Sequence, residues 1–343
     1  MRTTLVHAVV ATAALVVAVG GSAAAGPHDF QKTTTGEIEA LAMDGSRIAY
    51  DVGARYGSAQ RCNAVYVWNV ATGPTRRVSG GKTCDADNTS TGAGVRELAV
   101  AGSRVAWIVN QGGNSESDDY LHVSSAARPG ERVLAFGIRT GNVDGVLTGS
   151  WIGGLVGAGS LLAVNRWSTG SDGAVTSARL QRIGTGLRAL ASGPGAMTAA
   201  STDGRQVAVL RADGSVGLYS TRGSLLREVK PSGAKEVALR GDYVAALTAA
   251  NALQVYNSHS GRLLHTWRVA RGASHLDVSN GLAGYAAGRT VHVVRLLTGR
   301  SLYSVRTGSP VRGLQLEPAG LAYALDAPHG KGKLVFVPLR FLL

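Results

Sequence analysis

The chain has 343 residues, of which 45% are hydrophobic, and a net charge of +13 from 35 Lys and Arg against 22 Asp and Glu. This length is ample for a buried core and would allow two domains. The basic residues are dispersed without a long run, and many follow a hairpin glycine, where they would discourage pairing between strand edges. This distribution argues against a nucleic-acid-binding surface.

The N-terminus has the pattern of a secretory signal peptide. Arg2 precedes an apolar run from Leu5 to Val19, and the small residues Ala23 to Ala25 follow. The run is shorter than the ~20 residues that a membrane-spanning helix needs. We therefore expect residues 1–25 to be removed and residues 26–343 to be secreted as a soluble, monomeric protein with no transmembrane segment.

A hairpin pattern then recurs along the chain. From Val65 to Val78, apolar residues alternate up to a tight turn at Gly73 and continue beyond it, and residues 253–269 and 291–305 repeat the arrangement. Alternation on both sides of a glycine turn predicts a β-hairpin. No helical periodicity follows the signal peptide, so an all-β fold is expected.

A second marker counts the repeats. It is a tight glycine turn followed by a short apolar strand that contains alanine. The seven alanines are Ala49, Ala106, Ala163, Ala208, Ala245, Ala283 and Ala322, at intervals of 57, 57, 45, 37, 38 and 39 residues. A period of this size with only strand patterns predicts a seven-bladed β-propeller of four-stranded antiparallel blades.

The last repeat lacks one strand. Residues 311–317, 321–326 and 333–339 read as its three strands, and the chain ends at Leu343 before a fourth. Residues 27–35 precede the first repeat and have no other assigned place. We predict that they pair as the missing outer strand and close the ring of a single domain.

Two short motifs resemble known propeller families. Val67-Trp68-Asn69 before Ala71-Thr72-Gly73 resembles the end of the third strand in WD40 repeats, and the Asp44-Gly45 and Asp203-Gly204 turns are similar to those of TolB-type exported propellers. The Gly-His pair of WD40 repeats and the Ser-Pro-Asp-Gly motif of TolB are both absent. The resemblance therefore implies the fold, and the buried His–Asp network of WD40 repeats does not carry over.

The two cysteines predict a disulfide. Cys62 lies 11 residues before Gly73 and Cys84 lies 11 residues after it, so a hairpin that turns at this glycine sets them opposite each other. Secreted proteins meet an oxidising environment, and a loop of about 20 residues would gain roughly 3 kcal/mol from the cross-link. There is no nearby His for a zinc site and no Cys-x-x-Cys redox motif.

Long insertions predict the binding surface. They fall in the first three repeats, on one face of the disc, and binding residues concentrate on such loops. They are residues 51–61, 82–94, 110–119, 137–151 and 165–173. Their aromatic and acidic residues suit a sugar or a peptide, and the binding candidates are Tyr56, Trp151, Trp167, Asp118 and Asp119. The alternative is a set of solvated loops whose tryptophans pack on the blades. Calcium at Asp118 and Asp119, or at Asp85 and Asp87, is an alternative, but neither stretch matches a known calcium loop, so no metal is expected.

The central channel offers weaker candidates for catalysis. Glu97, Glu236 and His275 lie on predicted innermost strands and could form an acid–base cluster, or could be solvated channel liners. No nucleophile elbow, metalloprotease motif or phosphate loop is present. We therefore expect a non-catalytic propeller that binds a protein or a cell-surface polymer without a cofactor. The alternatives are a hydrolase or lyase at the channel, and a quinoprotein-like oxidoreductase, whose repeated Trp motif this chain lacks.

Overall fold

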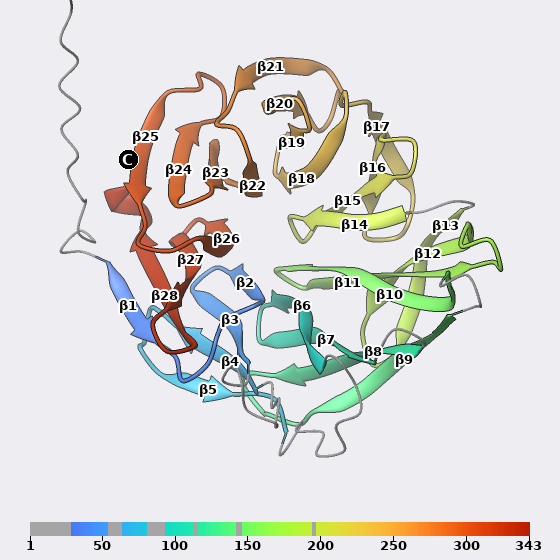
Figure 1. Cartoon of the computed structure of the whole chain (residues 1–343). Coiled ribbons are helices and arrows are strands. Elements are labelled where there is room, and N and C mark those ends of the chain that lie inside the picture. The colour runs from blue at the N-terminus through green and yellow to red at the C-terminus, as the bar shows by residue number, and fades with distance from the viewer. Residues whose placement is uncertain (1–28, 54–63, 81–92, 113–115, 142–145, 194–196) are drawn as a thin grey trace, which may run out of the picture.

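The sheets of this protein stand around a central axis like the blades of a propeller (Figure 1). A computed structural model describes residues 29–53, 64–80, 93–112, 116–141, 146–193 and 197–343. Within these ranges the chain forms strands and one short 3-10 helix, η1 (Leu339–Phe341). None of its described helices is long and apolar enough to cross a membrane.

The described residues form 28 strands in six hydrogen-bonded sheets, five with four strands and one with eight. The first sheet holds β2 (Leu41–Asp44), β3 (Arg47–Val52), β4 (Ala64–Asn69) and β5 (Thr75–Arg77). The eight-stranded sheet holds β6 (Ala93–Ala101), β7 (Arg104–Gly112), β8 (Glu116–Ser125), β9 (Arg132–Gly141), β10 (Leu147–Ala158), β11 (Leu161–Thr169), β12 (Val175–Ile183) and β13 (Leu187–Gly193).

Four further sheets complete the ring. One holds β14 (Met197–Thr202), β15 (Gln206–Arg211), β16 (Val216–Ser220) and β17 (Leu225–Val229), and the next holds β18 (Ala234–Arg240), β19 (Tyr243–Thr248), β20 (Ala252–Asn257) and β21 (Leu263–Arg268). Another holds β22 (Ala273–Ser279), β23 (Leu282–Ala287), β24 (Thr290–Arg295) and β25 (Ser301–Arg306). The last holds β26 (Val311–Glu317), β27 (Gly320–Ala327), β28 (Lys331–Pro338) and β1 (Phe30–Thr33).

The two ends of the described chain meet in this last sheet. β1 pairs antiparallel with β28, from Phe30 opposite Phe336 to Thr33 opposite Lys333. The Thr34 amide then donates to the Gly332 carbonyl at 2.9 Å. The N-terminal strand thus occupies the outer edge of the sheet that contains the C-terminal strands.

The core lies between neighbouring sheets, and the repeated alanines explain how the sheets approach so closely. Strands β2, β6, β10, β14, β18, β22 and β26 line the axis, and each contacts the next around the ring. All seven marker alanines lie on the strand next to the inner strand of their blade-like unit, and each has 0% exposure. Larger apolar side chains such as Ile48 and Trp107 fill the remaining space between sheets. A methyl group at each marker position therefore leaves room for the neighbouring sheet.

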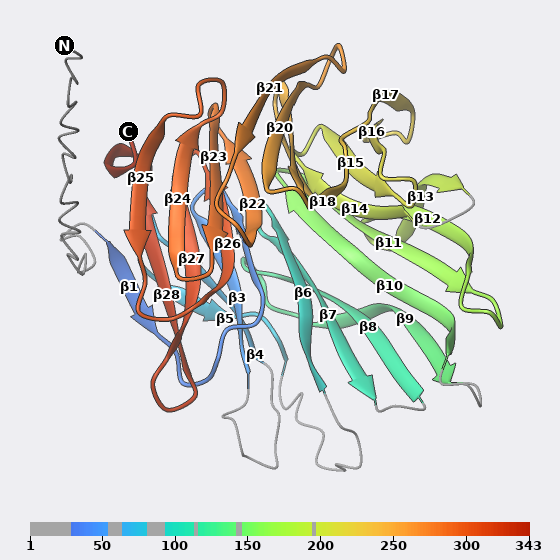
Figure 2. The same cartoon turned by 45° about the horizontal axis from the view of Figure 1, so that its top comes forward.

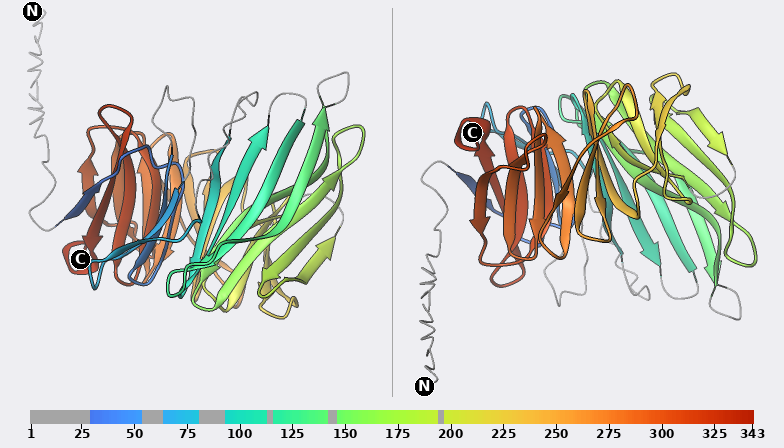
Figure 3. Two further views of the ribbon diagram at one scale, coloured as in Figure 1. Left: turned by 90° about the horizontal axis from the view of Figure 1, so that it is seen from below. Right: turned by 90° about the horizontal axis from the view of Figure 1, so that it is seen from above.

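The eight-stranded sheet departs from the expected set of separate four-stranded blades. β9 continues into β10 because residues 147–149 pair with residues 141–139. Strands β6 to β12 have 9 to 12 residues, whereas the other described strands have at most eight. These strands rise further along the axis than those of the other sheets (Figures 2 and 3).

The expected loops in this part of the chain are therefore largely strands. Residues 110–112 and 116–119 belong to β7 and β8, and most of the described part of 137–151 belongs to β9 and β10. The polar residues of these stretches favour loops in the sequence. In the structure, the side chains of β8 alternate in burial: Ser117 and Asp119 are buried, and Asp118 and Tyr120 are more exposed. The buried polar side chains, Ser117 and Asp119, have hydrogen-bond partners. The strand can therefore continue through them.

Removal of β1 is expected to destabilise the ring. A shortened chain that begins at Thr34 exposes the edge of β28, and an unpaired edge invites aggregation. Compared with a matched chain that begins at Phe30, we expect the shortened chain to have a lower Tm and to aggregate in a concentration-dependent way. Thermal unfolding with light scattering measures both. Equal stability of the two chains would contradict this role of β1.

Candidate functional site

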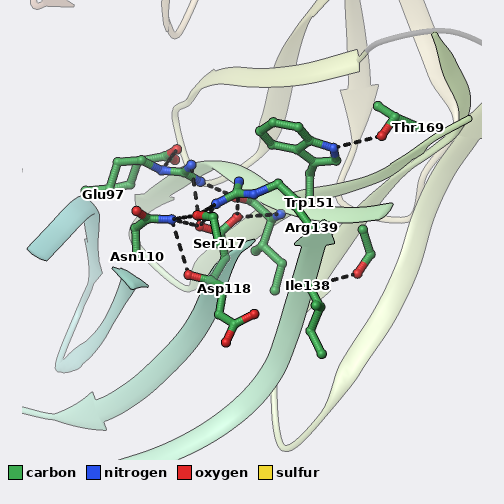
Figure 4. A network of polar contacts seen from close by, with 12 residues as sticks. Glu97, Asn110, Ser117, Asp118, Ile138, Arg139, Trp151 and Thr169 are labelled. Atoms are coloured by element: carbon green, nitrogen blue, oxygen red, sulfur yellow. Dashed lines mark hydrogen bonds and ion pairs between the residues drawn. The ribbon is translucent and has the colours of Figure 1, made fainter. Parts of the chain in front are cut away.

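The two predicted tryptophans lie directly opposite each other on β10 and β11. The Trp151 and Trp167 rings stack with centroids 5.8 Å apart and an interplanar angle of 8°. The Arg139 guanidinium lies 4.2 Å from the centroid of the Trp151 ring, and the Trp151 indole Nε1 donates to Thr169 Oγ1 at 3.1 Å (Figure 4). Both rings are half-buried, so the pair is packed into the structure and only partly open to a ligand.

Asp119, another predicted binding residue, is fully buried and contacts Arg139, which lies against the Trp151 ring. Its carboxylate accepts from Arg139 Nη1 at 2.9 Å and from Asn110 Nδ2 at 2.9 Å. Ser117 accepts a further hydrogen bond from Arg139. Burial lowers the pKa of the Arg139 guanidinium and the nearby Asp119 opposes this shift. A buried charge needs such pairing, so Asp119 supports the fold here.

The same network satisfies the backbone of β10. Beyond Gly149 this strand leaves β9, and unpaired backbone groups are costly when buried. Asp119 Oδ2 lies 3.4 Å from the Ile152 amide that donates to it, and Arg96 donates to the Ile152 carbonyl. Glu97 Oε2 accepts from the Leu155 amide at 2.7 Å. Side chains on β6 and β8 therefore replace the missing strand partner.

An equivalent pair of links recurs on the opposite side of the ring. On β18, Lys235 Nζ donates to the Ala273 carbonyl at 2.5 Å, and Glu236 Oε2 accepts from the Leu276 amide at 2.8 Å. Leu276 lies in a bulge of β22 that removes it from the β22–β23 ladder. A basic residue followed by an acidic one on an inner strand thus holds the backbone of the next inner strand.

Of the three residues of the predicted acid–base cluster, only Glu236 and His275 are neighbours. Glu97 lies on β6 and Glu236 on β18, with β10 and β14 between them in the ring. Burial raises the pKa of Glu97. Burial lowers the pKa of His275, and its neighbour Glu236 opposes that shift. The structure therefore places His275 beside Glu236, while each glutamate is engaged with the backbone of a different strand.

The channel also contains an arginine–glutamate pair that the sequence did not reveal. Arg240 on β18 donates to Glu317 on β26 through both guanidinium Nη atoms, one of them at 3.0 Å. The pair borders a pocket of about 140 Å³ that Asp277 also lines. Burial raises the pKa of Glu317 to about 8, against the effect of Arg240, and burial raises that of Asp277 to about 6. The two partners lie 77 residues apart, so no local pattern signals them.

Several predictions fall outside this network. Tyr56, Cys62 and Cys84 lie outside the described residues, and the disulfide stays a prediction. Asp118 lies on β8, where its carboxylate accepts from the Tyr120 hydroxyl at 3.3 Å. Among the residues that the structure describes, no three His, Cys, Asp or Glu side chains are grouped to hold a metal ion.

Comparison with known proteins identifies the fold. No protein-family model matches the chain, and no curated protein matches its sequence. A chain from the crystal structure of the mitotic checkpoint complex is similar over 98% of this chain and 99% of its own length, with 14% identity and a TM-score of 0.58. The protein therefore has a WD40-like propeller fold.

Two other structures show weaker similarity, each with a TM-score of 0.49. The computationally designed protein Ika8 is 17% identical over 89% of this chain and 98% of its own. Sqt1 from Saccharomyces cerevisiae is 10% identical over 90% of this chain and 98% of its own.

Replacing Asp119 should destabilise the protein far more than replacing its neighbour. Asp119→Ala leaves the Arg139 charge buried without its carboxylate, a loss of on the order of 3–5 kcal/mol. Asp118→Ala removes one hydrogen bond from a less buried side chain and should cost below about 1.5 kcal/mol. Chemical unfolding of both variants measures the difference, and equal losses would contradict the structural role of Asp119.

The channel carboxyls predict a stability that falls with rising pH. The native pKa of Glu317 is about 8, so the unfolded chain, with a pKa near 4.5, loses this proton first as the pH rises. The free energy of unfolding should therefore decline between about pH 4.5 and 8. Glu317→Gln should remove part of this decline, whereas Glu116→Gln, at an exposed site, should retain it. Urea unfolding at several pH values tests this, and an unchanged slope in Glu317→Gln would refute it.

Proposed function

We propose that this protein is an exported, non-catalytic propeller that binds a protein or a cell-surface polymer through its second and third blades. We count the eight-stranded sheet as two blades of four, which gives seven blades with the ring of seven inner strands. The proposal rests on strands β6 to β12, which are longer than the other described strands. Closure of the ring does not require this extra length.

The observation that carries the proposal is the exposed apolar side of β9. Phe136 is 58% exposed, Val133 is 52% exposed and Ile138 is 44% exposed, while Ala135 and Arg139 on the other side of the strand are buried. Single exposed apolar residues are common, but a contiguous group points to an interaction surface. Tyr120 and Asp118 lie opposite Phe136 and Ile138 on β8, and add an aromatic ring and a carboxylate.

The state of the channel supports the same proposal. Glu97 and Glu236 each accept a hydrogen bond from a strand backbone, which leaves them poorly placed to exchange protons with a substrate. The similar chain of the mitotic checkpoint complex belongs to a multiprotein assembly. That comparison is an analogy at the level of the fold, because the fold alone does not determine function.

A pair of double variants tests the surface. Phe136→Ser with Ile138→Ser changes the proposed site, and Leu225→Ser with Leu226→Ser changes two leucines on β17 that are exposed to a similar degree, 50% and 48%. Binding of the purified protein to isolated cell envelopes and to secreted proteins of the native host would be measured by sedimentation and pull-down. We expect the β9 variant to lose at least tenfold in binding and the β17 variant to match the wild type.

The opposite pattern would refute the proposal. Full binding by the β9 variant, or an equal loss in both variants, would show that the β9 surface is not the site. Circular dichroism and the Tm of each variant establish that the fold is retained.

A further inference from the structure

A basic pocket lies on the third blade, on the side of β10, β11 and β12 that carries Ser150 and Arg166. Its volume is about 230 Å³. Its lining residues are Ser150, Arg166, Trp167, Ser168, Ser177, Arg179 and Gln181. Two of the seven are arginines and none is acidic, so the pocket is positively charged.

The strand register aligns these groups into two rows. Ser150 lies opposite Ser168, which lies opposite Ser177, so three hydroxyl side chains cross three strands in line. In the adjacent row, Arg166 lies directly opposite Arg179. Residues directly opposite in an antiparallel sheet project from the same face. The pocket therefore combines two guanidinium groups with neighbouring hydroxyl donors.

The two arginines have no carboxylate partner in the part of the chain that the structure describes. Among the described residues, Arg166 donates only to the Phe136 carbonyl, at 3.4 Å, and no ion pair includes either arginine. Like charges directly opposite each other destabilise a sheet. The cost of this arrangement would be offset by an anion that binds between them, since guanidinium groups pair strongly with phosphate and related oxyanions.

We propose that this pocket, defined by Arg166, Arg179, Ser168 and Ser177, binds a tetrahedral oxyanion, a phosphate or sulfate group. This deepens the proposed function, on which it rests for the biological ligand: a polymer that carries such groups would place one here. β9 borders the pocket, because Arg166 donates to the Phe136 carbonyl and Ser150 Oγ accepts from the Ile138 amide at 3.1 Å. The anion pocket and the exposed side of β9 can therefore contact one ligand.

Calorimetric titration of the whole protein with inorganic phosphate and with sulfate, at constant ionic strength, tests the pocket. We expect saturable binding by the wild type and at least tenfold weaker binding by Arg166→Gln and by Arg179→Gln. Arg222→Gln, which removes an exposed charge from the β16–β17 turn, should bind within twofold of the wild type. No saturable binding by the wild type, or an equal loss in Arg222→Gln, would overturn the proposal, because the second result reflects net charge alone.

A second titration with polyphosphate distinguishes the source of the anion. Tighter binding per phosphate group than for inorganic phosphate indicates a polymer, and equal binding indicates the free anion; both results support the pocket. The β9 variant, Phe136→Ser with Ile138→Ser, should bind inorganic phosphate as the wild type does. If phosphate binding fails while the β9 surface still binds cell material, only the anion pocket is refuted. If phosphate binds but the β9 variant loses nothing on cell material, only the proposed function is refuted.

Discussion

The backbone of each inner strand needs partners on the side where no strand follows. In an ordinary sheet the next strand supplies them, but around the axis of a ring the neighbouring blade presents side chains instead. Glu97 and Glu236 each hold an amide of the next inner strand, and Asp277 holds the Leu316 amide at 2.7 Å. Buried backbone groups must be satisfied, so these carboxylates join neighbouring inner strands in addition to the apolar core.

This constraint also engages acidic residues of the channel. Glu97, Glu236 and Asp277 accept hydrogen bonds from backbone amides, and Glu317 pairs with Arg240. The features that ring closure does not explain lie further out, on the long strands of the eight-stranded sheet. There the exposed apolar side of β9 adjoins a pocket whose two arginines have no carboxylate partner among the described residues, and we propose that the two together bind an amphipathic, anionic partner.

The sequence predicted the fold because its signals are local and repeated. Each marker alanine is fully buried between sheets, so a position that admits only a methyl group recurs with the blade period. The site was harder to predict. Asp119 and Arg139 look like loop residues in the sequence, since charge is unusual on a buried strand face, and only the pairing of β8 with β9 brings them together. The Arg166–Arg179 pair depends likewise on the register of β11 and β12.

The central claim is that acidic side chains of one inner strand hold the backbone of the next. Amide hydrogen exchange at Leu155 and Leu276, followed by NMR, tests it most directly. In Glu236→Ala the Leu276 amide should lose its protection while that of Leu155 keeps it, and Glu236→Gln, which retains an acceptor oxygen, should preserve most of the protection. Unchanged protection of Leu276 in Glu236→Ala would contradict the claim. The Glu236 carboxylate would then be available as a proton donor or acceptor.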